Sequence, residues 1–303
     1  MSFFFVKVFM VICVLLSVAF LTLIERKILG YIQKRKGPNK VGFVGLLQPF
    51  ADALKLVTKE FMNFYFINKI IFYFMPVVSL ILMMMFWFMI SLSFSWKVVS
   101  MYELILIMVI SSLGVYVIIF MGWSSNSKYA LLGAYRGVSQ MISYEVCLSF
   151  LILGVILFSG SYLVEKISYF QKMGGSMILS FFLLFMLWLV IILAEVNRTP
   201  FDLSEGESEL VSGFNVEYGG VMFALFFISE YGNILFMSWL TVSVFFSTMG
   251  IFLINFFIVF SLILIIRGTL IRYRYDYLMM LAWKVILPFS ILVVMIFFFF
   301  FFI

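Results

Sequence analysis

The sequence predicts an all-α integral membrane protein with about eight transmembrane helices and an interfacial amphipathic helix after the first. Its 303 residues are 65% hydrophobic and only 11% charged, and their mean hydropathy is +1.21. A chain of this composition cannot surround an apolar core with polar atoms in water. Apolar stretches of about 20 residues recur along it, the length at which a helix crosses roughly 30 Å of hydrocarbon. Residues 1–303 are therefore expected to form a single polytopic membrane domain.

Eight apolar stretches are long enough to be spans. The first leads directly into the charged run Glu25-Arg26-Lys27 and has no small-x-small cleavage pattern, so we expect a span there and not a signal peptide. The others follow along the whole chain. In order, the predicted spans are Phe3–Ile24, Ile70–Leu92, Met101–Gly122, Ile142–Phe158, Met177–Ala194, Val216–Leu240, Met249–Ile266 and Leu281 to the Phe-rich end.

The basic residues are distributed unevenly between the two sides of this topology. Most of the 20 Lys and Arg residues follow the first, third, fifth or seventh span, and the exceptions are Lys7, Lys97, Lys166 and Lys172. Positive loops remain on the side from which a membrane protein is inserted. The basic loops are therefore expected on the inner side, and both termini on the opposite side.

Residues 25–69 are expected to form a basic loop that contains the interfacial helix. A turn around Gly37 interrupts any continuous helix. From Leu46 to Glu60, apolar and charged side chains then occupy separate helical faces, and Pro49 suits a first turn. This stretch is too short and too polar to span, so its apolar face is expected toward acyl chains or a neighbouring helix. A lipid-like ligand can enter beside it, and the alternative is an ordinary interfacial anchor.

Residues 195–217 are expected to form an acidic loop between two apolar stretches. Carboxylates near lipid are costly unless they have a partner or a function. One interpretation is that they change ionisation while protons move, and the other is that the loop is a solvated surface that docks on a basic partner. Docking does not explain the two further acids Glu145 and Glu230, which lie within predicted spans. The loop's acids are Glu195, Asp202, Glu205, Glu207, Glu209 and Glu217, with Arg198 as the cation among them.

The sequence also limits the chemistry that this chain can perform. It contains no histidine and only two cysteines, Cys13 and Cys147, both in predicted spans. These residues cannot supply the usual ligand sets of haem, zinc or iron–sulfur centres, and no Ser–His or Cys–His pair can form. We therefore expect no catalytic residue and no metal in this chain, and any redox chemistry must be borrowed from other chains.

Several long motifs occur in the order found in a known family. The chain resembles, over essentially its whole length, the subunit 1 family of mitochondrial NADH:ubiquinone oxidoreductase (respiratory complex I), whose bacterial counterpart is the H subunit. Ile271 and Met280 depart from the family's frequent proline and histidine. The motifs are Glu25-Arg26-Lys27, GYIQKRKGPNKVG with the downstream QPFADALKL, EVNRTPFDLSEGESELVSGFNVEY, and RYRYDYLM before Trp283-Lys284.

The resemblance implies a core membrane subunit of a proton-pumping enzyme, with a tunnel through which ubiquinone, the substrate, enters from the bilayer. It implies that this chain alone binds no cofactor, and that NADH, FMN and iron–sulfur clusters belong to partner subunits. The implied partners are the hydrophilic-arm quinone-module subunits, neighbouring membrane-arm subunits and membrane lipid, with no nucleic acid. The excess of Phe, Met and Ile without His favours the mitochondrial inner membrane, with the basic loops toward the matrix.

The resemblance assigns two groups of candidate residues. The positions matched to the quinone tunnel are Glu25, Arg26, Gln33, Arg35 and Phe50. Those matched to the acidic route for protons are Tyr144, Glu145, Glu195, Arg198, Asp202, Glu205, Glu207, Glu209, Glu217, Glu230, Arg272 and Arg274. The acids at or within spans rank above the loop acids. Arg198 lies three residues after Glu195 and is expected to pair with it on one helical face, while Arg272 and Arg274 are expected to offset other acids.

Two other functional classes compete with this interpretation. A stand-alone ion or solute transporter would also use acids within the membrane, although transporters more often show repeated halves and no repeat is evident here. A purely structural membrane anchor would explain the hydrophobicity and the acidic loop, but not the acids within spans. Gly133 and Gly137 have a small-xxx-small spacing, which is expected to allow close helix packing and not to bind a ligand.

Overall fold

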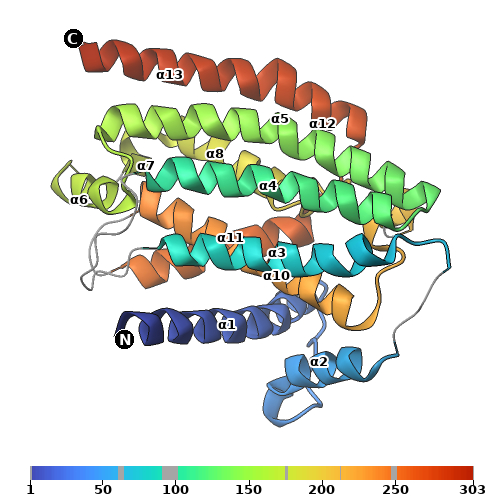
Figure 1. Ribbon diagram of the computed structural model, residues 1–303. Helices are drawn as coiled ribbons and strands as arrows, with labels where there is room; N and C mark the ends of the chain where they lie inside the picture. The colour runs from blue at the N-terminus through green and yellow to red at the C-terminus, as the bar shows by residue number, and fades with distance from the viewer. Residues whose placement is uncertain are drawn as a thin grey trace.

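The computed structural model describes residues 2–60, 65–90, 102–174, 177–211, 213–246 and 251–302. Within these ranges the chain is mainly helical and contains no strand, which confirms the all-α prediction. The long helices lie side by side in one bundle, and both termini lie at the same end of it (Figure 1). The residues of the sequence prediction that lie outside the described ranges are Leu92, Lys97, Met101 and Met249.

Seven helices in the described part of the chain are long and apolar enough to cross a membrane. They correspond to predicted spans one to four and six to eight. The last of them is interrupted by a π-helical turn, η3. Their bounds are α1 Ser2–Ile32, α3 Lys69–Met89, α4 Glu103–Ser124, α5 Lys128–Ser159, α10 Gly220–Phe245, α11 Phe252–Thr269, and α12 Tyr275–Leu281 continued through η3 Ala282–Ile286 into α13 Leu287–Phe302.

The fifth predicted span is divided into two pieces. A short helix, α7 (Met177–Ser180), is followed by a break at Phe181 and then by α8 (Phe182–Glu195), an apolar helix of 14 residues. The second half of α8 lies inside the bundle, where Trp188 is fully buried, whereas Phe182 and Leu183 at its start are exposed. This helix therefore ends with a carboxylate, Glu195, that is itself buried among the other helices.

Two helices are longer than the apolar stretches that predicted them. α5 begins at Lys128 and not near Ile142, and α1 continues to Ile32, past Glu25-Arg26-Lys27. Hydropathy detects only the apolar part of a helix, whereas charged residues such as Glu, Arg and Lys are good helix formers and continue it into polar surroundings. The basic segment after the first span is therefore helical at its start.

Short helices lie at both ends of the bundle. The predicted interfacial helix is present as α2 (Gln48–Thr58), with Pro49 buried in its first turn and the apolar side chains of Leu54 and Val57 65% and 60% exposed. α2 lies at the end of the bundle opposite the termini, whereas α6 (Val164–Gly174), which the sequence did not predict, lies at the end with the termini (Figure 1). The remaining short elements are η1 Phe43–Gly45, α9 Glu207–Leu210 and η2 Gly213–Asn215.

Candidate functional site

The acidic loop packs on α5 through glycines. A Cβ atom added to Gly133 would lie 2.9 Å from both the Ser204 carbonyl oxygen and the Gly213 Cα, and one added to Gly137 would lie 2.8 Å from the Ser204 Cβ. Gly213 itself has a φ of 56°, a conformation that suits glycine. Gly133 and Gly137 were expected to allow close packing of helices. In this structure they instead allow the acidic loop to pack closely on α5.

The end of α8 is held by a buried amide on α5. The Gln140 Nε2 donates hydrogen bonds to the carbonyl oxygens of Ala194, at 2.9 Å, and Phe201, at 2.7 Å. The Tyr144 ring is fully buried beside Phe201, with 6.1 Å between the ring centroids. One side chain of α5 thus joins the last turn of α8 to the loop that follows it.

Arg198 lies at the centre of the charged residues. The chain leaves the helix after Glu195 and turns at Asn197, whose φ is 52°, so Arg198 is not on a helical face with Glu195 as its spacing suggested. Its Nη2 instead donates to the Glu230 Oε2 at 3.2 Å, and its guanidinium carbon lies 4.7 Å from the Tyr231 ring centroid. The side chains of the ion pair are 5% and 14% exposed.

The acids around Arg198 keep it charged. Burial lowers the pKa of the guanidinium, but Glu230 first, and then Tyr231, Glu205 and Asp202, raise it, and the resulting pKa lies above the ordinary value. Arg198 is therefore a fixed cation in a buried place. Breaking a buried ion pair by removing one partner typically costs about 3–5 kcal/mol, because the other charge is left without compensation.

The loop acids next to Arg198 also have polar partners, Asp202 on the segment after α11 and Glu205 within the loop. The Arg272 Nη2 donates to the Asp202 Oδ2 at 3.0 Å, and the Asn215 Nδ2 donates to the Glu205 Oε1 at 3.0 Å. Burial raises the pKa of Asp202, although Arg272 and then Arg198 oppose the shift. Arg272 therefore offsets an acid, as expected from the sequence.

The other loop charges lie nearer the surface. Glu209 forms an ion pair with Arg136 of α5, and Arg274 forms one with Asp276, at 3.2 Å, instead of with the acidic loop. Glu217 is half-buried, and Glu207 begins α9, although its side chain lies outside what the structure describes. Ile271 is 87% exposed. Close to it, the Tyr273 amide donates to the Pro200 carbonyl oxygen at 3.0 Å, and Arg272 is bonded to Asp202.

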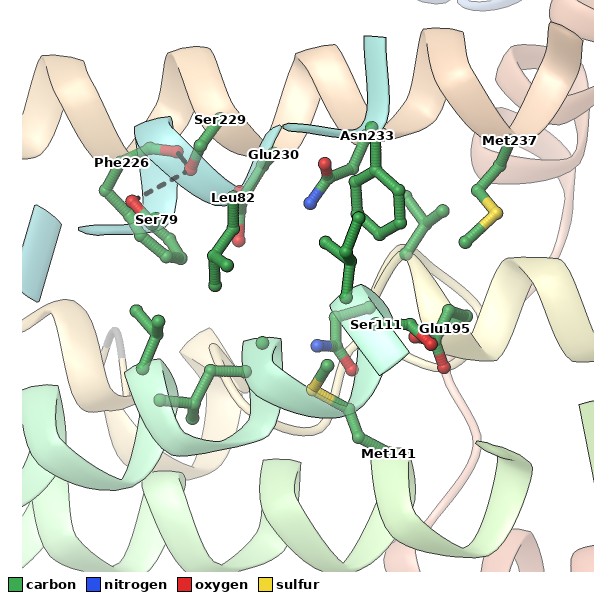
Figure 2. A pocket seen from close by; sticks show the side chains of 17 residues that line it. Ser79, Leu82, Ser111, Met141, Glu195, Phe226, Ser229, Glu230, Asn233 and Met237 are labelled. Carbon is green, nitrogen blue, oxygen red and sulfur yellow. Dashed lines mark hydrogen bonds between the residues drawn. The ribbon is translucent and has the colours of Figure 1, made fainter. Parts of the chain in front are cut away.

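Glu195 and Glu230 line one cavity of about 80 Å³, which has room for several water molecules. Glu230 lines it from α10, and Glu195 lines it from the end of α8, apart from Glu230 (Figure 2). Beside Glu230, the Ser229 Oγ donates to the Ser79 Oγ at 3.1 Å. The polar residues of the lining are Ser79, Ser111, Glu195, Asn197, Ser229, Glu230 and Asn233.

Several buried polar atoms around this cavity have no hydrogen-bond partner among the described residues. Each such atom costs about 1–3 kcal/mol if it stays unpaired. Glu145 of α5 interacts electrostatically with Glu195, which adds a third acid next to the cavity. The atoms concerned are Glu145 Oε1, Glu195 Oε2, Asn197 Oδ1, Arg198 Nε and Asn233 Oδ1. Polar groups at this depth are typical of a route for protons or ions.

The residues matched to the quinone tunnel fall into two places. Arg26 forms an ion pair with Asp52, and the Phe50 ring meets Phe20 edge to face at 6.0 Å, so these contacts join α2 to α1. Glu25 is buried on the same helix and pairs with Arg267 of α11.

The other two matched positions, Gln33 and Arg35, lie in the exposed turn after α1. The structure therefore brings Arg26 and Phe50 together at the junction of α1 and α2. It leaves Gln33 and Arg35 at the surface of this chain.

Sequence reasoning missed the uncharged members of the site. Asn233 lies three residues after Glu230, so a helical projection places both on one face of α10 and gives a signal for it. Asn197 and Gln140 gave no such signal, because their roles depend on where α8 ends. The described residues contain no group of three or more Cys, Asp or Glu side chains placed to hold a metal ion.

Comparisons with known proteins identify the relatives of this chain. The model of a family described as NADH dehydrogenase matches residues 6–298. Similar proteins called NADH-ubiquinone oxidoreductase chain 1 occur in Aedes aegypti, 51% identical, and in Rhipicephalus sanguineus, 46% identical. A third, from Lampetra fluviatilis, is 47% identical. In each case the match covers 93% of this chain and 90% of the relative.

Proposed function

The chain belongs to the NADH dehydrogenase family and is a membrane subunit of an NADH:ubiquinone oxidoreductase, and from this premise we propose that its acidic cavity couples quinone reduction to proton translocation. Ubiquinone is the substrate in this proposal. The electrons come from NADH through FMN and iron–sulfur clusters held by partner subunits of the hydrophilic arm. The contribution of this chain is to bind, orient and exchange protons.

The observation that carries the proposal is the shared cavity of Glu195 and Glu230 inside an apolar helical bundle. A carboxylate buried in an apolar bundle is costly unless it is paired or exchanges protons, and Glu195 forms no ion pair with any residue that the structure describes. A docking surface does not require acids at this depth. A route in which protons pass between neighbouring groups does.

Arg198 provides the link between the loop and the cavity. It is bonded to Glu230 on one side and interacts electrostatically with Asp202 and Glu205 on the other. When quinone reduction changes the charge near the loop, the balance of acids around Arg198 changes. When Asp202 and Glu205 attract Arg198 more strongly, its interaction with Glu230 weakens, and Glu230 takes up a proton from the cavity. The protonation of Glu195 and then of Glu145 changes as a result.

The test is Glu195→Gln and Glu230→Gln, each in the assembled complex. We expect the number of protons pumped per ubiquinone reduced to fall at least about tenfold, because an amide cannot exchange a proton. NADH oxidation by an artificial electron acceptor should be unchanged. Glu60→Gln, at an exposed acid after α2, serves as the control and should pump normally. Normal pumping in both cavity variants would remove the proposal.

For quinone entry, we propose the junction of α1 and α2. The exposed apolar face of α2 and the Phe20–Phe50 contact offer a surface for an isoprenoid tail, and Arg26 with Asp52 forms its polar rim. Gln33 and Arg35 are proposed to reach the headgroup where partner subunits cover the exposed turn, and Glu25 to fix the end of α1 through Arg267. A photoreactive ubiquinone should label α1 or α2, and labelling only elsewhere would contradict this entry route.

We further propose the mitochondrial inner membrane as the location, with the basic loops toward the matrix. Both termini lie at one end of the bundle and α2 at the other, so the two ends face opposite sides of a membrane (Figure 1). A cysteine placed at Lys36, in the basic turn, should react with an impermeant reagent only from the matrix side. Reaction from the opposite side would reverse the orientation.

A further inference from the structure

The cavity contains uncharged acceptor atoms that neither carboxylate satisfies. Asn197 and Asn233 both line it, and the Oδ1 of each is buried and has no hydrogen-bond partner in the part of the chain that the structure describes. The Glu195 Oε2 is likewise buried and has no hydrogen-bond partner among these residues. Three acceptor oxygens thus meet around one space that is large enough for water, and a donor must come from within that space.

The two asparagines are placed on either side of the carboxylates. Asn233 is one helical turn from Glu230 on α10, and the side chains of both line the cavity (Figure 2). Asn197 is two residues after Glu195, in a backbone conformation with φ 52° that asparagine tolerates better than most residues. Each carboxylate therefore has one amide beside it, supplied by its own segment.

We infer that Asn197 and Asn233 are positioning residues that hold a short row of water molecules between Glu195 and Glu230. An amide cannot accept and release protons near neutral pH, so it does not carry the proton itself. It accepts a hydrogen bond from a water molecule and fixes the direction of that molecule's other bonds. The proton then passes through oriented water from one carboxylate to the other, with no net change at either asparagine.

This inference rests on the proposed function and adds to it the residues that order the water. Hydroxyl groups lie beside Glu230, but Ser229 already donates to Ser79 and Ser79 to the Pro76 carbonyl oxygen. The serines are thus satisfied within the protein, whereas the asparagine oxygens are available to water. The amides therefore control the polar part of the cavity beside the acids.

The test uses the assembled complex with Asn233→Leu, which keeps a similar volume and removes the amide. We expect the number of protons pumped per ubiquinone reduced to fall about tenfold, the factor to which the loss of one supporting hydrogen bond corresponds. The pH profile of pumping should also shift. Asn233→Ser, which restores a hydroxyl acceptor, should recover most of the loss. Met222→Leu, an apolar change on the same helix outside the cavity, should leave pumping within about twofold.

The outcomes separate this inference from the function on which it rests. If Glu195→Gln and Glu230→Gln pump normally, the proposed function fails. If those variants lose pumping while Asn233→Leu and Asn197→Leu retain it with an unshifted pH profile, only the positioning role is overturned. A high-resolution structure of the unmodified complex tests it without any variant: we expect ordered water within about 3.2 Å of both Oδ1 atoms, and a dry cavity would overturn it.

Discussion

Two sets of ion pairs at the same end of the bundle differ sharply in burial. Arg198 and Glu230 are 5% and 14% exposed, whereas Arg136 and Glu209 are 33% and 47% exposed and Arg274 and Asp276 are 73% and 63% exposed. The same residue types thus serve different purposes. The two charges of a buried pair depend on each other because water cannot solvate either of them. The attraction within an exposed pair is weak because water screens it. Burial, and not the number of charges, distinguishes the pair that the proposed proton route would use.

The largest expected effect is that of Arg198→Met. Its removal leaves Glu230 buried without a cation, which should lower the free energy of unfolding by about 3–5 kcal/mol and reduce the amount of assembled complex. Thermal unfolding of the purified complex and native gel electrophoresis measure this. The double variant Arg198→Met, Glu230→Gln should regain much of the stability, because neither charge then remains. Equal losses of stability in the single and double variants would show that the unpaired charge of Glu230 is not the cause, and would contradict the distinction between buried and exposed pairs.

The second effect concerns how the acidic loop reaches α5. Gly213→Ala would place a Cβ against the Ser204 carbonyl oxygen in a backbone conformation that alanine avoids, and we expect a loss of about 3 kcal/mol. Gly160→Ala is the matched control, since Gly160 has a similar φ of 64° but no atom within 4 Å of its added Cβ. It should cost only about 1 kcal/mol. The rate at which a protease cuts the acidic loop is measured in both variants. Similar rates would contradict the close packing of the loop on α5.

A smaller effect is expected for Arg272→Met. The Arg272–Asp202 pair is 25% and 11% exposed, between the two sets, and losing its charged hydrogen bond should cost about 2 kcal/mol. Burial already raises the pKa of Asp202, so without Arg272 this acid should be protonated at still higher pH. The shift can be followed by the infrared carboxyl band against Asp202→Asn. An unchanged titration would show that Arg272 does not act on Asp202.

The smallest effect is expected for Arg136→Ala at the exposed pair. Its contribution should be below about 1 kcal/mol and should disappear in high salt, because exposed pairs are screened. Unfolding measured at low and high ionic strength tests this in one experiment. A loss as large as that of Arg198→Met would remove the distinction between buried and exposed pairs.

The fold was predictable where apolar length decides it. Spans and the interfacial helix follow from hydropathy and periodicity, which is why α2 and the long helices appear near their expected positions. Helix ends were less predictable, because α1 and α5 continue through charged residues that hydropathy reads as loops. α6 was missed because its 11 residues are too few and too polar to be a span, although they form an amphipathic helix.

The candidate site was predictable as a set of acids but not as an arrangement. Sequence spacing joined Arg198 to Glu195, whereas the end of α8 turns the chain and directs Arg198 to Glu230. Ion pairs between distant elements, such as Arg272 with Asp202 and Glu25 with Arg267, depend on tertiary packing that no local pattern contains. The uncharged cavity residues were missed for the same reason.

The length of α5 has a mechanical consequence. Its 32 residues extend about 48 Å, well beyond the roughly 30 Å of a hydrocarbon layer. One continuous rod therefore carries Arg136 near its protruding end, Gln140 at the end of α8, and Glu145 deeper in the membrane. A neighbour that pushes on the protruding end tilts the whole rod, so displacement outside the bilayer reaches Glu145 without any segment having to bend.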